Sequence, residues 1–341
     1  MLRLATWNVE WFDRLFDDSG ALLDDAEWSG RRDVTREDQI AALGVVFRAL
    51  DADGIMVIEA PAENHVRSCT RALETFAARF GLRARRAVIG YPNQTQQEIA
   101  FLFDPDLMTA RHDPRGQPTG KKGSREAPRF DGVFRIDLDQ DGRDDLITWS
   151  KPPLELAVST RSGAELRLIG VHAKSKAPHG ARSPADLMRI AIENRRKQLA
   201  QCVWLRARVD AHLAAGQSLM VMGDFNDGPG LDDYERLFGR SGVEIVAGNG
   251  DEVPMHDPSV RRALTRRFAA PPVTSRFTLP DGEVMSALLD YIMVSPDLRE
   301  HLPRWQIWHP WDNPACVTTP LLRDALLTAS DHFPVMLDIE L

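Results

Sequence analysis

The chain has few cysteines, and their number argues against a disulfide framework. Its 341 residues include three, Cys69, Cys202 and Cys316, which lie far apart. Secreted proteins that depend on disulfides usually carry an even set at regular spacing. We therefore expect reduced thiols and a cytoplasmic protein.

The sequence also lacks a long hydrophobic run. Its start, Met1-Leu2-Arg3-Leu4, contains no extended apolar stretch, so we expect no signal peptide. No apolar segment approaches the roughly 20 residues that a membrane-spanning helix needs. We therefore expect no membrane insertion.

Positive charge is not in excess either. The formal net charge is −8, whereas a dedicated nucleic-acid binder usually presents a basic stripe. The charge balance disfavours such a binder. It does not exclude an enzyme that cuts nucleic acid, because a bound cation offsets local carboxylates.

No repeat, low-complexity tract or Ser/Gly-rich linker divides the chain. Hydrophobic residues make up 43% and charged residues 27%, as in ordinary globular proteins. Length alone suggests about two domains, but the motifs described below are interleaved from end to end. We predict a single domain over residues 1–341 with a loop insertion around 113–150, where proline, glycine and charged residues gather.

Six short apolar runs lead directly into polar groups that can do chemistry. Such runs are typical of buried strands whose ends open onto a cleft. The polar groups are Asn8 with Glu10, Glu59, His172 with Lys174, Asp224 with Asn226, Asp290, and Asp331 with His332. A single Asp at a strand end is more often a turn former or a helix cap. Six coincidences favour a shared site.

These groups supply what metal-assisted hydrolysis of a phosphate ester requires: carboxylates for a hard cation, a base for water, and donors for phosphoryl oxygens. The order Trp7-Asn8, Ile58-Glu59, Val171-His172, Gly223-Asp224-Phe225-Asn226, Leu289-Asp290-Tyr291-Ile292, Ser330-Asp331-His332-Phe333-Pro334-Val335 resembles the endonuclease/exonuclease/phosphatase superfamily. The superfamily includes deoxyribonuclease-I-like nucleases, abasic-site endonucleases, neutral sphingomyelinases and inositol polyphosphate 5-phosphatases. The resemblance spans residues 4–335, and its motifs Gly223-Asp224-Phe225-Asn226 and Ser330-Asp331-His332-Phe333-Pro334-Val335, in this order, are highly specific.

The resemblance implies an α/β fold, a four-layer αββα sandwich of two mixed β-sheets with outer helices. The catalytic cleft would lie at one edge of the sheets. The sequence itself predicts a helix that begins near Thr35 and leads into the strand ending at Glu59. Ser183-Pro184 predicts the start of a long helix that runs to about Ala215.

The resemblance implies a Mg²⁺ site, with Mn²⁺ as a substitute. Glu59 is the first ligand it suggests, Asp331 a second, and Asn8 a nearby amide oxygen. Glu10 lies two residues after Asn8, so an extended chain would put both on one face and make Glu10 an outer partner. Asp331 and His332 can both serve only if the chain turns there, and we predict that it does.

The resemblance also implies the catalytic roles. Asp224 would orient and deprotonate water, and Asn226, on the same face in an extended chain, would donate to a phosphoryl oxygen. His332 would contact the phosphate and be oriented by Asp290. His172 would donate to the phosphate or assist the leaving oxygen.

Two lysines and one glutamate complete the candidate site. The family often has Arg before the Pro-Pro-Leu motif, where this chain has Lys151, which keeps the charge without the bidentate fork. Lys174 shares a strand face with His172, although an exposed lysine explains it equally well. In the family a carboxylate near residue 98 supports the catalytic histidine, and Glu98 is the candidate.

A separate acidic stretch resembles a calcium loop. Oxygen side chains at Asp137, Asp139, Asp141 and Asp145, with Gly142 at the turn, match a short Asp-rich Ca²⁺ loop. Thr148 stands where an EF-hand would have its acidic residue. The alternative is a polar hairpin turn, and any Ca²⁺ here would be structural and remote from catalysis.

Three functions remain open. The first is a Mg²⁺-dependent phosphodiesterase acting on a phosphate-ester substrate, with nucleic acid favoured. The second is a phosphatase or lipid phosphodiesterase of the same fold, of the inositol phosphate or sphingomyelin type. The third is a non-catalytic binding module, which is disfavoured because every polar position of the motif set is intact.

Overall fold

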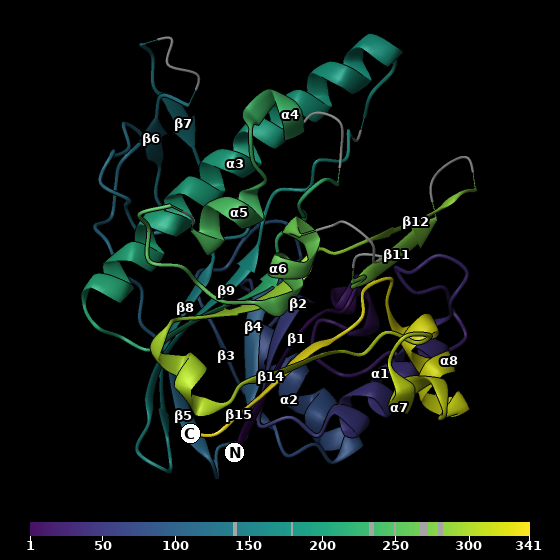
Figure 1. Cartoon of the computed structure of the whole chain (residues 1–341). Helices are drawn as coiled ribbons and strands as arrows, with labels where there is room; N and C mark the ends of the chain where they lie inside the picture. The colour runs from purple at the N-terminus through teal and green to yellow at the C-terminus, as the bar shows by residue number, and fades with distance from the viewer. Residues whose placement is uncertain (139–141, 179, 232–234, 249, 266–271, 279–281) are drawn as a thin grey trace.

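The computed structural model describes the chain except residues 139–141, 179, 232–234, 249, 266–271 and 279–281. Two mixed β-sheets pack face to face, and helices cover the outer face of each (Figure 1). The four-layer α/β sandwich predicted from the sequence is confirmed.

The larger sheet has six strands and contains both ends of the chain. Its strand order is β14 (Arg304–Ile307), β15 (Val335–Ile339), β1 (Leu2–Asn8), β2 (Gly54–Ala60), β4 (Glu98–Phe103) and β3 (Arg86–Ile89). Strand β1 runs parallel to β2 and antiparallel to β15, with Leu2 opposite Ile339. The two termini therefore lie side by side (Figure 1).

The smaller sheet has five strands. Its order is β13 (Asp290–Val294), β10 (Leu219–Asp224), β9 (Glu165–His172), β8 (Leu154–Thr160) and β5 (Met108–His112). Strands β9 and β10 are parallel, while β13 is antiparallel to β10. Two separate hairpins complete the strands: β6 (Phe134–Ile136) with β7 (Asp145–Ile147), and β11 (Ser275–Thr278) with β12 (Val284–Ala287).

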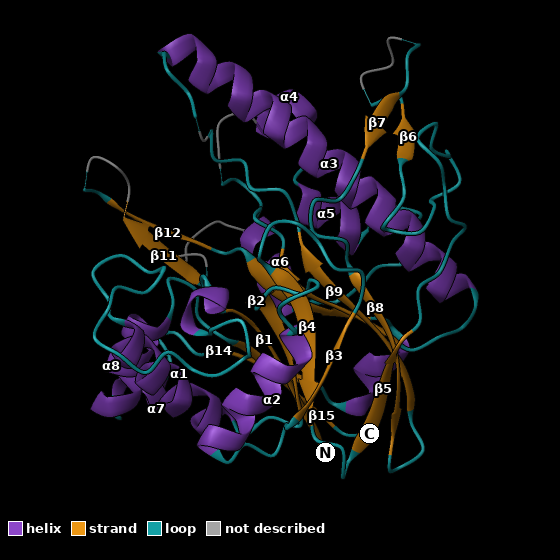
Figure 2. Ribbon diagram, turned by 180° about the vertical axis from the view of Figure 1, so that it is seen from behind, coloured by secondary structure: helices purple, strands orange, loops and turns teal. Residues whose placement is uncertain are grey.

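Helices form the outer layers (Figure 2). The six-stranded sheet is covered by α1 (Arg36–Leu50), α2 (Cys69–Phe80), α7 (Pro314–Val317) and α8 (Pro320–Ala329), with the 3₁₀ turn η1 (Phe12–Leu15) beside them. The five-stranded sheet is covered by α3 (Pro184–Ala214), α5 (Gly242–Ala247) and α6 (Pro258–Leu264). The remaining short elements are α4 (Glu235–Phe238) and the 3₁₀ turn η2 (Asp297–His301).

Capping side chains set the starts of the two predicted helices. The Thr35 hydroxyl accepts a hydrogen bond from the Asp38 amide at the start of α1, and Ser183 does the same for Asp186 at the start of α3. Such caps satisfy amides that have no partner within a helix. Both predicted helices are confirmed. Although α3 has 31 residues, none of the helices in the described ranges is apolar enough to cross a membrane.

Three hydrophobic cores hold the layers together. One lies between the six-stranded sheet and α1, α2 and α8, and includes Trp7, Phe12, Phe47 and Phe76. A second lies between the two sheets. The third lies under α3 and includes Trp204 and Phe134, whose rings stack with centroids 5.3 Å apart. The 113–150 segment therefore packs on α3 through its hairpin.

Candidate active site

The motif residues gather where strands of both sheets end. In the five-stranded sheet Asp224 pairs with His172 on one side and with Asp290 on the other. In the other sheet β1 ends at Asn8, and His332 lies just before β15. The carboxyl ends of β1, β2, β9 and β10 therefore meet the amino ends of β13 and β15.

Gly223 allows the strand ends to come this close. Its φ is +138°, and a Cβ added there would lie 2.1 Å from the carbonyl oxygen of Val171. No other residue could adopt that conformation in that space without displacing β9. The glycine before Asp224 thus sets the separation of Asp224 and His172.

Asp224 is the buried centre of the site, with 1% of its surface exposed. Its Oδ2 accepts hydrogen bonds from Nδ2 of Asn8 and Nδ2 of Asn226, each at 3.1 Å, and its Oδ1 accepts from the Asn226 amide at 2.7 Å. Burial raises the pKa of Asp224 to about 7, against the opposing charge of His332. A carboxylate with that pKa is matched to general-base work near neutrality.

Asn226 reaches Asp224 by a turn, not by strand alternation. Strand β10 ends at Asp224, and Asn226 has a φ of +50°. The two side chains do meet, as expected. The expected reason, an extended chain that places both on one face, is wrong. Asn tolerates this left-handed conformation better than most residues.

His332 is oriented by Asp290. Its Nδ1 lies 2.8 Å from Oδ2 of Asp290, and its Nε2 lies 4.0 Å from Oδ2 of Asp224. Burial alone lowers the pKa of His332, but the carboxylates of Asp290 and Asp224 outweigh it and hold that pKa well above 6.5. The imidazole is therefore a cation at neutral pH and can donate from Nε2.

His172 has the opposite character. Its Nε2 lies 3.3 Å from Nζ of Lys151, 3.7 Å from Oδ2 of Asp224 and 4.0 Å from Oε1 of Glu59. Burial, together with the charges of Lys151 and His332, holds the pKa of His172 well below 6.5. Burial also lowers the pKa of Lys151. Nζ of Lys151 and Nε2 of His172 thus lie within hydrogen-bond distance of each other beside Asp224.

The remaining acids line a neighbouring part of the site. Glu59 has a φ of +61° at an irregularity in β2, and its Oε2 accepts from the Trp11 amide at 3.0 Å. Glu10 Oε2 accepts from the Asp331 amide at 2.9 Å. Burial, reinforced by the charge of Asp331, raises the pKa of Glu10 to about 7. Glu10 reaches Asp331 from a φ of +47°, not from the extended chain expected.

The predicted turn at Asp331 and His332 is present. Asp331 lies in a bend, and its Oδ1 is 3.9 Å from Nε2 of His332, so both side chains face the site. Ser330 holds the bend: its hydroxyl donates to the Asn8 carbonyl and accepts from the His332 amide.

Two carboxylate groupings could hold a divalent cation. Asp224, Asp290 and His332 offer atoms that all lie within 4.8 Å of one another. In this cluster, Oδ2 of Asp290 is already hydrogen-bonded to Nδ1 of His332. The second set is Glu59 and Asp331, which are less deeply buried, with Glu10 accepting a hydrogen bond from the Asp331 amide. Oxygen ligands of this kind fit Mg²⁺.

Not every predicted residue joins the centre. Lys174 Nζ donates to the Ser175 carbonyl, and no described contact links it to His172. Glu98 does not support a histidine, because its carboxylate accepts from the amides of Glu63 and Asn93. The carboxylate that lies beside His332 is that of Asp290.

Two residues of the predicted calcium loop, Asp139 and Asp141, lie outside the described residues. Asp137 accepts from the Gly142 amide at 3.0 Å, as in a polar turn. Asp145 is 3.1 Å from Nη2 of Arg196 on α3. The described half of the loop thus serves the hairpin and its contact with α3.

Sequence reasoning missed the supporting residues. Thr274 Oγ1 accepts from the amides of Leu289 and Asp290, and so fixes the start of β13. Arg31 donates to Oε2 of Glu10 and, through Nη2, to the Leu327 carbonyl at 2.9 Å. Both lie in irregular segments with no periodic pattern, so only the contacts reveal them.

The chain is similar to known proteins in sequence pattern and in fold. A family model described as "Endonuclease/Exonuclease/phosphatase family" matches residues 5–332. The structure resembles an AP endonuclease from Archaeoglobus fulgidus, with a TM-score of 0.50 and 11% identity over 100% of both chains. At that identity the likeness shows the fold alone.

Two further structures score slightly lower. A truncated TDP2 from Caenorhabditis elegans has a TM-score of 0.49 and 12% identity over 100% of this chain and 98% of that one. The mannosyl-6-phosphatase Bt3783 from Bacteroides thetaiotaomicron VPI-5482 has a TM-score of 0.49 and 13% identity over 99% of each. No curated protein sequence matches the chain.

Proposed function

Because this chain belongs to the endonuclease/exonuclease/phosphatase family, whose members hydrolyse phosphate esters, we propose that it is a Mg²⁺-dependent phosphodiesterase that cleaves nucleic acid. Attack by water would form one P–O bond and break another, and release an alcohol and a phosphate monoester. The observation that carries the proposal is Asp224, buried among two amides and two imidazoles of opposite protonation.

Glu59 and Asp331 would hold the metal ion. Neither carboxylate forms an ion pair with Lys or Arg among the described residues. Mg²⁺ prefers one or two such carboxylates with water and substrate oxygens completing its shell, and Mn²⁺ would substitute. When bound, the ion supplies charge stabilisation on the phosphoryl oxygens.

The protein groups divide the remaining work. Asp224 would accept the proton of the attacking water, and the Asn8 and Asn226 amides hold its carboxylate in place. His332, as a cation, would donate from Nε2 to a phosphoryl oxygen, with Asp290 fixing the ring. Neutral His172 and Lys151 would stabilise the charge that develops on the phosphoryl and leaving oxygens.

The cysteines support a location in a reducing compartment. All three cysteines are buried and unpaired, and burial raises the pKa of Cys69 and Cys202. Together these features support our proposal of a cytoplasmic location.

Hydrolysis by purified protein tests the proposal, measured with Mg²⁺ and with EDTA on a panel of substrates. The panel holds plasmid DNA, single-stranded DNA, RNA, bis(p-nitrophenyl) phosphate, inositol polyphosphates and sphingomyelin. We expect Mg²⁺-dependent cleavage of a nucleic acid and its loss in Asp224→Ala. Cleavage confined to inositol phosphates or sphingomyelin would move the protein to the phosphatase or lipid class. If folded protein cleaves none of these substrates, the non-catalytic binding module becomes the favoured function.

A further inference from the structure

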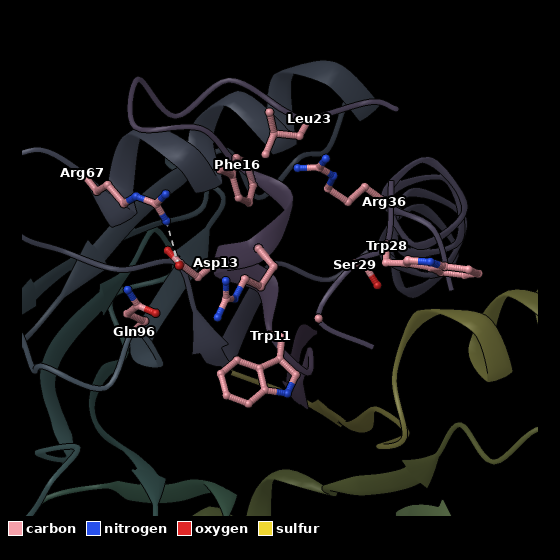
Figure 3. Close-up of a pocket in the computed structure, with 11 residues that line it drawn as sticks. Trp11, Asp13, Phe16, Leu23, Trp28, Ser29, Arg36, Arg67 and Gln96 are labelled. Atoms are coloured by element: carbon pink, nitrogen blue, oxygen red, sulfur yellow. Dashed lines mark hydrogen bonds and ion pairs between the residues drawn. The ribbon is translucent and has the colours of Figure 1, made fainter. Parts of the chain in front are cut away.

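A large cavity lies next to Glu59 and outside the set of groups assigned to catalysis. Its volume is about 560 Å³, and its lining includes Trp11, Arg14, Trp28, Arg36, Arg67 and Gln96. Figure 3 shows Arg67 and Asp13 on one side, Trp28 and Arg36 on the other, and Trp11 between them. These residues come from η1 and the residue before it, from residues 16–36, and from the segments that precede α2 and β4.

Trp11 connects this cavity to the active site. The Trp11 amide donates a hydrogen bond to Oε2 of Glu59 at 3.0 Å, and 37% of the surface of Trp11 is exposed to solvent. Both Glu10 and Trp11 have positive φ, at +47° and +59°. Such strain persists only where surrounding contacts enforce it and is concentrated at functional sites. The chain is therefore bent so that Glu10 enters the site and the indole stands at its border.

Gly30 allows the loop to close over this border. A Cβ at Gly30 would lie 2.4 Å from Cβ of Trp11 and 3.1 Å from Cγ of Arg14. The loop backbone thus packs directly against both side chains. It forms a wall of the cavity and holds the indole and the guanidinium stem in place.

The charge of the cavity is unevenly compensated. Arg67 pairs with Asp13 at 2.8 Å, and Arg36 pairs with Asp25 at 2.8 Å. Within the described residues, the exposed guanidinium of Arg14 has no acidic partner and no side-chain hydrogen bond. The Arg14 guanidinium is therefore available to a ligand that also contacts the exposed Trp11 indole.

We propose that this cavity is a nucleotide subsite that takes the residue flanking the scissile phosphate of a single-stranded nucleic acid. The inference rests on the proposed phosphodiesterase function and names the substrate class. The base stacks on the Trp11 indole, and the Arg14 guanidinium contacts a backbone phosphate. Stacking of this kind is worth about 1–3 kcal/mol per base and tolerates any sequence.

The lining favours a nucleotide over a lipid. A phosphate accepts well from a guanidinium, and the Gln96 amide can hydrogen-bond a base edge. An acyl chain would bury Asp13, Arg36 and Arg67 against hydrocarbon, which is unfavourable for charged groups. The net charge of −8 does not oppose the proposal, because stacking does not depend on a basic stripe.

Binding without catalysis is the first test. The anisotropy of a fluorescein-labelled oligothymidylate is measured in EDTA, where no hydrolysis intervenes. We expect the dissociation constant to rise about 10-fold for Trp11→Ala, in line with loss of one stacked base. Trp11→Phe should recover most of the affinity. Arg14→Gln should weaken binding and flatten its dependence on salt by about one phosphate contact.

The matched control is Arg161→Gln. Arg161 is also exposed, but it lies in the β8–β9 turn at the opposite end of the five-stranded sheet. It should bind as the wild type does. Equal affinity of Trp11→Ala, Arg14→Gln and the wild type for the oligonucleotide would overturn the subsite.

A set of three substrates separates this subsite from the reaction itself. Thymidine 5′-(p-nitrophenyl phosphate), its 3′ isomer and methyl p-nitrophenyl phosphate share a leaving group, and only the first two carry a nucleoside. Trp11→Ala should lower kcat/KM for one nucleoside isomer about 10-fold more than for the methyl ester. Equal losses on all three would overturn the subsite while leaving the phosphodiesterase intact. Absence of all hydrolysis, with oligonucleotide binding still dependent on Trp11, would refute the phosphodiesterase and support nucleotide binding in the cavity alone.

Discussion

Nδ1 of His332 lies 2.8 Å from Oδ2 of Asp290, and the two residues belong to different sheets. Asp290 begins β13 of the five-stranded sheet, and His332 lies just before β15 of the six-stranded sheet. The Trp7 indole nitrogen donates to the His332 carbonyl at 2.9 Å, which fixes the histidine to β1 as well. The pair therefore links the two sheets where the proposed chemistry takes place.

The pair should act as one unit in catalysis. His332→Gln removes the cationic donor, and we expect turnover to fall at least ~10²-fold, as with loss of a charge-stabilising donor. Asp290→Asn should cause a comparable loss, because the imidazole loses both its orientation and the charge that keeps it protonated. The double variant should lose little more than either single one. Steady-state kinetics on purified, folded variants gives the comparison.

Multiplicative losses would show that the two residues act separately. Near-normal turnover in His332→Gln would remove His332 from the mechanism. Circular dichroism of each variant serves as the folding control, since Asp290 is 1% exposed and its substitution can also disturb β13.

Metal dependence should distinguish the two carboxylate groupings. If Glu59 is a ligand, Glu59→Gln should raise the Mg²⁺ concentration for half-maximal activity at least ~10-fold, because an amide oxygen is a weaker ligand than a carboxylate. Isothermal titration of Mn²⁺ into the protein should show the same loss of affinity. The exposed Glu165→Gln, at the far end of β9, is the matched control.

Asp290→Asn completes this comparison. We expect it to leave the Mg²⁺ requirement unchanged even as turnover falls, because Asp290 serves His332. A shift with Asp290→Asn and none with Glu59→Gln would place the ion among Asp224, Asp290 and His332.

The sequence was sufficient for the architecture and for the centre of the site. Buried strands that end in polar groups, such as β10 at Asp224 and β9 at His172, made the convergence predictable, since parallel strands present the same end at one edge. The Ser330–Val335 motif also carried its own turn, which Ser330 stabilises by hydrogen bonds to Asn8 and His332.

The sequence was insufficient where a contact joins irregular segments. Arg31 reaches Glu10 across 21 residues of loop and turn, and neither the spacing nor the composition of that loop indicates a partner. Strand alternation also gave the wrong geometry for Glu10 and Asn226, because the chain leaves the strand at each of these residues through a positive φ. Glu98 was assigned to a histidine from its position, but backbone amides of a neighbouring turn occupy its carboxylate.

Gly223 should be essential to the stability of the site. Gly223→Ala would place a Cβ 2.1 Å from the Val171 carbonyl oxygen, on backbone that cannot retreat freely. Gly163→Ala is the matched control, because Gly163 also has positive φ, at +92°, but nothing lies within 4 Å of its added Cβ. We expect Gly163→Ala to cost about 1–2 kcal/mol from backbone strain alone. Gly223→Ala should cost at least about 2 kcal/mol more from overpacking.

Urea unfolding of both variants measures the difference. Equal destabilisation would mean that β9 and β10 separate readily at this point. In that case activity should survive in Gly223→Ala, and the close approach of Asp224 and His172 would not be needed for function.

Glu98 should make the stability of the protein depend on pH. Burial raises the pKa of its carboxyl from 4.5 to about 7. At a pH between these two values, the folded state keeps a proton on Glu98 that the unfolded state has already released. The stability this proton gives is complete below pH 4.5 and is lost as the pH rises through 7. The loss is about 3 kcal/mol at most.

Glu98→Gln should remove this dependence, because glutamine imitates the protonated acid at every pH. Its Oε1 can still accept from the Asn93 and Glu63 amides. We expect the variant to match the wild type near pH 5 and to be the more stable of the two at pH 8, as measured by urea unfolding across that range. Other buried acids such as Asp257 also titrate, with a pKa raised by burial to about 6, so the difference between the two proteins is the quantity to follow. A constant difference from pH 5 to 8 would mean that Glu98 keeps its charge throughout, with the hydrogen bonds from the Asn93 and Glu63 amides outweighing its burial.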